Sequence, residues 1–217
     1  MIEVTEQVNA VRRQAGRRML EAGEVHSVLI SQDYDAPAED VWDACTNPLR
    51  IPRWFLPVSG ELKLGGRYQL EGNAGGIIER CDPPHSFAAT WEFGGQVSWI
   101  EVRVTAGADG RTRLEIEHLA PVDAAGWAEF GPGAVGVGWD MALVGLASHL
   151  SSAGEMDPQR GVAWAASADG RRFITLSSAR WGEASVASGT DAEAARAAAQ
   201  RTTAFYTGGE APRDAAP

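Results

Sequence analysis

The chain has 217 residues, enough for one domain with extensions and a sizeable core. Its formal net charge of −10 argues against a nucleic-acid partner, because phosphate contacts need clustered Lys and Arg side chains. No apolar run reaches the roughly 18 residues of a membrane span, and the first residues lack the apolar centre of a secretory signal. The two cysteines, Cys45 and Cys81, have neither metal-ligand nor disulfide-framework spacing. We therefore expect no metal, no cofactor and a reducing, cytoplasmic setting.

The first predicted element is an amphipathic helix over residues 4–22, with Gly23 as its stop signal. Its apolar residues recur at helical spacing: Val4, Val8, Val11, Ala15 and Met19. The basic side chains between them are interpreted as a solvated helix face. Residues 1–23 are thus expected to form a helix outside the main domain.

The main domain is expected to span residues 24–153 and to open with a strand over residues 25–34. Asp35 and Pro37 then start a helix, since an aspartate can accept from free N–H groups and proline is tolerated in a first turn. A second short helix ends on Trp54 and Phe55. The bulky side chains of these two short helices can be buried only if the helices pack against a large sheet.

Alternating apolar and polar residues predict that sheet. Strands are expected over residues 67–71, 76–81, 87–93, 99–104 and 113–118, joined by short links rich in glycine or proline. Clean alternation with such links is typical of an antiparallel meander with one buried face. A long apolar helix over residues 135–152 follows. The glycine-rich Gly131–Gly138 segment before it is interpreted either as an anion site at a helix N-terminus or as a mobile gate.

These elements predict an α+β fold in which six or seven strands form a curved antiparallel sheet around the long helix. Because sheets twist and curl, the helix across the concave side should leave a cavity. Helical segments over about 169–189 and 190–205 indicate a C-terminal helical extension over residues 154–207. Residues 208–217 have glycine, proline and charge without periodicity, and we expect a disordered tail there.

Several segments together resemble the SRPBCC, or START-like, superfamily, in its branch related to the heat-shock-protein-90 ATPase activator. The segments are D-Y-D-A-P-A-E-D-V-W-D-A-C-T-N-P with R-W-F (33–55), G-G-R-Y (65–68), I-E-R-C-D-P-P (78–84), A-T-W-E-F (89–93), L-E-I-E-H (114–118) and G-W-D-M-A-L (138–143). The resemblance covers residues 25–152. It implies a helix-grip fold whose cavity, in relatives, holds lipids, polyketides or other apolar small molecules. It implies no catalytic set, because branches of the superfamily share the fold and differ in chemistry.

The candidate ligand-binding residues are bulky side chains expected on the concave face of the sheet, at the helix pair or on the long helix. They are Trp54, Phe87, Trp91, Phe93, Trp139 and Leu143. The alternative for each of them is a place in the hydrophobic core without ligand contact, since aromatic side chains bury large areas.

Two titratable residues are candidates for acid–base chemistry, although whether any reaction is catalysed stays open. Glu79 shares a predicted face with Ile77 and Cys81, where an apolar environment would raise the pKa of its carboxyl. The alternative is a solvated strand residue or one paired with a neighbouring arginine. His118 continues the face of Leu114 and Ile116, and its alternative is a hydrogen-bonded core histidine.

Two hypotheses of function follow. In the first, the protein binds a small apolar, lipid-like or polyketide-like molecule between the sheet and the long helix. In the second, it is a co-chaperone-like or regulatory interaction module whose cavity is filled and whose terminal helices bind a protein partner; a homodimer is also left open. An open cavity of several hundred Å3 favours the first. A filled interior with exposed apolar stripes on the terminal helices favours the second.

Overall fold

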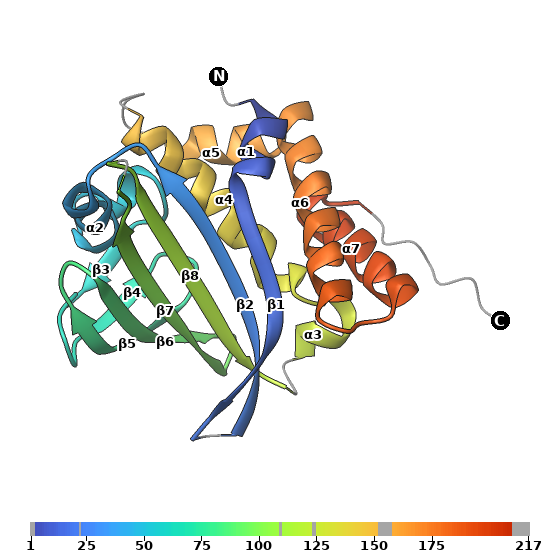
Figure 1. The fold of residues 1–217 in the computed structure, drawn as a ribbon, viewed down its shortest axis with the longest axis horizontal. Helices are drawn as coiled ribbons and strands as arrows, with labels where there is room; N and C mark the ends of the chain where they lie inside the picture. Colours follow the sequence, from blue (N-terminus) through green and yellow to red (C-terminus); the bar gives the residue numbers. More distant parts are fainter. Residues whose placement is uncertain (1–2, 22, 109, 123–124, 152–157, 210–217) are drawn as a thin grey trace.

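The computed structural model describes residues 3–21, 23–108, 110–122, 125–151 and 158–209 (Figure 1). Its centre is one eight-stranded antiparallel sheet with the strand order β1-β2-β8-β7-β6-β5-β4-β3. The strands are β1 (Val11–Leu20), β2 (Gly23–Tyr34), β3 (Val58–Gly60), β4 (Arg67–Leu70), β5 (Gly75–Asp82), β6 (Ser86–Phe93), β7 (Gln96–Ala106) and β8 (Thr112–Pro121). The helices are α1 (Val4–Ala10), α2 (Ala38–Thr46), the short 3-10 helix η1 (Ile51–Arg53), α3 (Ala125–Phe130), α4 (Gly133–Leu150), α5 (Pro158–Ala165), α6 (Ala168–Ala187) and α7 (Ala192–Thr207).

The α+β helix-grip architecture predicted from the sequence is confirmed, with one strand more than expected. Because side chains alternate between the two faces of a strand, every second residue of the central strands points toward α4. Examples are Ile116 of β8 and its partners Ile30 of β2 and Val102 of β7. These side chains are almost completely buried and share a core with Leu143 and Leu146 of α4. The long helix therefore lies against the concave face of the sheet (Figure 1).

The prediction of a helix over residues 4–22 is wrong beyond Ala10. Helix α1 ends there, and β1 continues as a ten-residue edge strand that pairs antiparallel with β2. The apolar residues Val11, Ala15 and Met19 are four apart, a spacing that places residues on one face of a helix and equally on one face of a strand. Length and charge favoured the helix, whereas the available edge of β2 decided for the strand.

The helices expected after residue 168 are present as α6 and α7. Ser167 accepts a hydrogen bond from the Gly170 N–H at the start of α6, and Asp191 accepts from the N–H groups of Glu193 and Ala194 at the start of α7. Gly208 ends α7 in the left-handed region at φ 69°. The expected disordered tail lies, from residue 210 on, outside the described residues.

The glycine-rich segment serves helix packing. From Gly133 on it belongs to α4, and a Cβ added at Gly136 would lie 2.3 Å from the Trp181 ring of α6. A Cβ at Gly133 would lie 2.9 Å from the Thr202 hydroxyl oxygen of α7. The glycines thus let two helices of the C-terminal extension pack directly on α4.

A buried ion pair completes this contact. Arg13 of β1 donates to Asp140 of α4, with 2.8 Å between Nη2 and Oδ1, and both side chains are almost fully buried. Trp181 Nε1 donates to the same carboxylate at 2.9 Å, and the Ser177 hydroxyl also donates to it. Residues from both ends of the chain therefore meet at one group of α4.

No helix in the described part of the chain is both long enough and apolar enough to cross a membrane.

Candidate functional site

A cavity of about 100 Å3 lies between the concave face of the sheet and the segment formed by α2, η1 and Trp139 of α4. We call it the inner cavity. Its walls are aliphatic and aromatic apart from one thiol and one phenol. They are formed by Cys45, Ile51, Trp54, Phe55, Val58, Leu62, Tyr68, Leu70, Ile78, Phe87, Ala89, Trp91, Ile100, Val102, Ile116 and Trp139.

The segment after α2 holds the aromatic wall of the inner cavity. Trp54 Nε1 donates to the Ala44 carbonyl at 2.9 Å, which satisfies the only polar atom of a buried indole. Phe55 stacks between Trp54 and Trp139, with ring centroids 5.5 and 6.0 Å away. The chain turns back through η1, which has proline in its first turn, and this turn points both aromatic rings at the sheet.

A cluster around Arg50 fixes that segment to α4. Its guanidinium lies 2.7 Å from Asp40 and 3.0 Å from Asp43, and its Nε donates to His149 Nε2 at 3.2 Å. Because Nε2 of His149 accepts here, the imidazole is neutral, and burial and Arg50 lower its pKa. The cluster joins α2, η1 and the last turn of α4.

The two polar groups of the inner cavity are both held neutral. Burial raises the pKa of the Cys45 thiol to about 12 and raises that of the Tyr68 phenol. Tyr68 Oη donates to the Thr90 carbonyl at 2.7 Å, so its proton is already engaged. Among the described residues, the lining therefore offers neither an ionised group nor an activated nucleophile.

A second cavity, of about 370 Å3, lies farther along the same concave face. We call it the outer cavity. It is bounded by the adjoining ends of β6, β7 and β8 on one side and by α3 and the first turn of α4 on the other. Among the residues that the structure describes, only Trp91 lines both cavities. Trp127 of α3 forms part of the wall of the outer cavity and stacks on His26 of β2, with ring centroids 3.8 Å apart.

His118 lies on the wall between the two cavities, fully engaged in hydrogen bonds. Trp139 Nε1 donates to its Nδ1 at 3.2 Å, so Nδ1 is the acceptor and Nε2 carries the proton. Nε2 is 2.9 Å from Ser98 Oγ, whose own hydroxyl donates to the Trp91 carbonyl at 3.1 Å. Burial lowers the pKa of His118 to about 4. The imidazole is therefore a neutral donor near pH 7.

The predicted ligand-binding residues divide among three places. Trp54, Phe87, Trp91 and Trp139 line the inner cavity. Phe93 is 58% exposed and belongs to the outer cavity, whereas Leu143 is 1% exposed and lies in the core between the sheet and α4.

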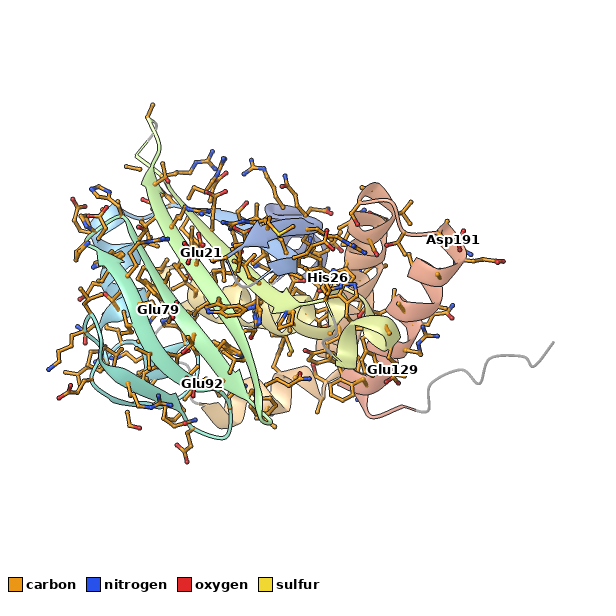
Figure 2. All side chains as sticks on the ribbon, turned by 90° about the horizontal axis from the view of Figure 1, so that it is seen from below. Glu21, His26, Glu79, Glu92, Glu129 and Asp191 are labelled. Carbon is orange, nitrogen blue, oxygen red and sulfur yellow. The ribbon has the colours of Figure 1, made fainter. Side chains whose placement is uncertain are left out.

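Glu79 lies away from both cavities. Ile78 pairs with Ala89 and Arg80 with Ala88, so β5 has one extra residue at this point, and Glu79 occupies the resulting bulge. Its side chain is exposed, and Figure 2 shows it across the sheet from His26. Of the two acid–base candidates, only His118 adjoins a cavity.

Sequence reasoning missed several wall residues. Ile100, Val102 and Ile116 follow the same alternation that indicated Trp91, so the signal was present in the pattern. Ser98 had no such signal, and Trp127 was indicated only as one of several tryptophans, because it reaches the cavity where α3 returns over the sheet. Within the described residues, His, Cys, Asp and Glu form no group of three or more that could hold a metal ion.

The curled antiparallel sheet, the long helix on its concave face and the apolar cavity between them define a helix-grip protein of the SRPBCC, or START-like, class. A sequence model of the family described as "Activator of Hsp90 ATPase homolog 1-like protein" matches residues 35–151. The chain belongs to this family.

Solved structures agree with that assignment. The crystal structure of CalU16 from Micromonospora echinospora is 36% identical, covers 83% of this chain and 99% of its own, and has a TM-score of 0.65. The solution structure of the same protein is 37% identical over 83% of this chain and 97% of its own, with a TM-score of 0.67. DynU16, a protein in the dynemicin biosynthetic locus, shares the fold at 20% identity, over 59% of this chain and 48% of its own, with a TM-score of 0.54. The search of curated proteins found no significant match.

Proposed function

We propose that this protein binds a small apolar molecule in the inner cavity. The observation that supports this most directly is a cavity whose walls are aliphatic and aromatic and whose two polar groups are neutral and, for Tyr68, already hydrogen-bonded. Membership in a superfamily whose fold encloses such a space agrees with it. An apolar guest gains by leaving water, and the wall places no ionised group against it.

The size of the inner cavity limits the guest. About 100 Å3 is below the several hundred Å3 expected for an open site. It is close to engineered apolar cavities of roughly 150 Å3, which stay dry and bind benzene. The part of the guest that enters is therefore a single ring or a short branched chain. The free cysteines agree with a reducing, cytoplasmic setting, which remains part of the proposal.

The alternative, an interaction module that binds through its terminal helices, has less support. The apolar residues that would form its surface, such as Val4, Val8 and Phe173, are at most 3% exposed and pack against one another and Val144 of α4. The large apolar side chains that are exposed on the C-terminal helices, Val162, Val186 and Phe205, lie on three different helices.

The test is toluene binding, followed by chemical shifts of the methyl groups of Ala89, Ile100 and Val102. All three should shift in the unmodified protein, and the Ile100 and Val102 methyl groups should not shift in Ala89→Leu, which fills the inner cavity. Ala88→Leu is the matched control, because Ala88 is the neighbouring residue on the opposite face of β6 and does not line the cavity. Unchanged methyl shifts in the unmodified protein would refute the proposal. Native mass spectrometry of the purified protein then seeks the natural guest and counts subunits.

A further inference from the structure

The outer cavity has the features of a second, independent binding site. Its volume of about 370 Å3 is within the range of pockets that hold drug-sized ligands, and the inner cavity is below that range. Its walls are mainly aromatic and aliphatic, including Trp91, Phe93 and Trp127. Val97 and Phe93 at its rim are 45% and 58% exposed, so apolar surface faces solvent there.

The Ser98 hydroxyl in this wall has unused hydrogen-bonding capacity. Ser98 Oγ accepts from His118 Nε2 and donates its own proton to the Trp91 carbonyl. A hydroxyl oxygen has two lone pairs, and no described residue uses the second one. The His118 network fixes the direction of this hydroxyl, since Trp139 holds the imidazole in a single tautomer.

We propose that the outer cavity binds a planar aromatic molecule that carries a hydroxyl group, a phenol of two fused rings. The rings pack against Trp91, Trp127 and Phe93, and the ligand hydroxyl donates to Ser98 Oγ. An ether or ketone cannot take its place at Ser98 Oγ, because Ser98 has no proton left to give. Two fused rings are too bulky for the inner cavity, so this site does not depend on the function proposed above.

The test compares 2-naphthol with 2-methoxynaphthalene, which keeps the rings and loses the donor, by isothermal titration calorimetry on the full chain. The unmodified protein should bind 2-naphthol roughly three- to tenfold more tightly, the ratio given by one neutral hydrogen bond. Ser98→Ala should reduce that ratio to about one. Equal affinity of the two probes for the unmodified protein, or no binding of either, would overturn the inference.

Two filling variants locate the site and do not rely on Ser98, whose loss leaves His118 Nε2 without its partner. Ala120→Phe fills the outer cavity and should abolish 2-naphthol binding, whereas Ile78→Phe in the inner cavity should leave it unchanged. The opposite result places the phenol in the inner cavity and refutes the inference. Toluene separates the two proposals, because it should still shift the Ala89 methyl group in Ala120→Phe. If 2-naphthol binds and toluene does not, the second site stands and the proposed function fails.

Discussion

His118 shows how one side chain can be near a cavity and yet unsuited to acid–base chemistry. Its Nδ1 accepts from Trp139, its Nε2 donates to Ser98, and it is 3% exposed. Protonation would add a proton at Nδ1, where the indole N–H already points, and would place a charge in an apolar wall. The residue is therefore a positioning group that orients Ser98 and Trp139.

The first prediction concerns pH. The folded-state pKa of His118 is about 4 against 6.5 for a free histidine, so the unfolded chain binds the extra proton first. The stabilisation from neutral His118 is complete above pH 6.5 and is lost as the pH falls from 6.5 to 4. Between pH 6.5 and pH 4, the cost of protonating His118 in the folded protein should reduce the free energy of unfolding by about 3 kcal/mol. Urea titrations at several pH values measure this.

The variant His118→Gln is the control, since glutamine can donate and accept but does not titrate. It should be less stable at pH 7, and its stability should depend less on pH between 4 and 6.5. An NMR titration of the His118 imidazole with a midpoint near 6.5 would contradict the prediction.

At this scale the sequence predicted the alternating residues well and the irregular ones poorly. Phe87 and Trp91 were assigned correctly because each strand alternates strictly. Of the two environments considered for Glu79, the structure shows the solvated one: a bulge in β5 shifts the register by one residue, and the Glu79 side chain is exposed there. No composition signal marks that bulge.

At the scale of elements, the contact between α4 and α6 depends on a missing side chain. Gly136→Ala would place a methyl group 2.3 Å from the Trp181 ring, so the ring must move away from its partner Asp140. We expect a loss of about 1–3 kcal/mol in the free energy of unfolding, the usual cost of overpacking. Chemical denaturation measures it.

Gly126→Ala in α3 is the matched control, because its nearest neighbour beyond the adjacent residues would lie 3.8 Å away. Alanine favours helices over glycine, so this variant should be at least as stable as the unmodified protein. Equal losses in both variants would show that close packing is not the cause.

Long elements with a single period were predictable, and short or ambiguous ones were not. The strands from β5 to β8 and helix α4 have clear periods, and all were placed within a few residues. Strand β1 was missed because a four-residue spacing fits both helix and strand, and only the free edge of β2 distinguishes them. A sequence pattern indicates which faces of a segment are apolar, whereas strand pairing also depends on a partner strand elsewhere in the chain.

For the whole molecule, the Arg13–Asp140 pair unites both ends of the chain with α4. Burial raises the pKa of the Asp140 carboxyl, and Arg13, Ser177 and Trp181 oppose that shift by donating to it. Breaking a buried pair leaves an unpaired charge, so Asp140→Ala should cost about 3–5 kcal/mol. The double variant Arg13→Met with Asp140→Leu should cost less than the sum of its single variants, as a double-mutant cycle will measure.

A more exposed ion pair, between Arg12 of β1 and Asp33 of β2, provides the comparison. Arg12 bonds to Asp33 with its side chain 59% exposed, and Arg12→Ala should change stability by no more than about 1 kcal/mol. Similar losses for Arg12→Ala and Asp140→Ala would indicate that burial has no special part in the Asp140 contact.

A chain ending at Ser151 tests whether the C-terminal helices are needed for folding. It lacks Trp181 and Thr202, so the glycine face of α4 is exposed and Asp140 keeps Arg13 alone. We expect a broad thermal transition and binding of a dye that reports exposed apolar surface. A sharp transition at the temperature of the full chain would show that the extension is dispensable.

Trp139 and Asp140 are consecutive residues of α4, one directed at the inner cavity and the other at Arg13 of β1 and Trp181 of α6. A guest that displaces the Trp139 indole should therefore also move the turn of α4 that carries Asp140, the residue to which the C-terminal helix α6 is hydrogen-bonded. Proteases attacking α7 should consequently distinguish an empty protein from a filled one without ever reaching the guest.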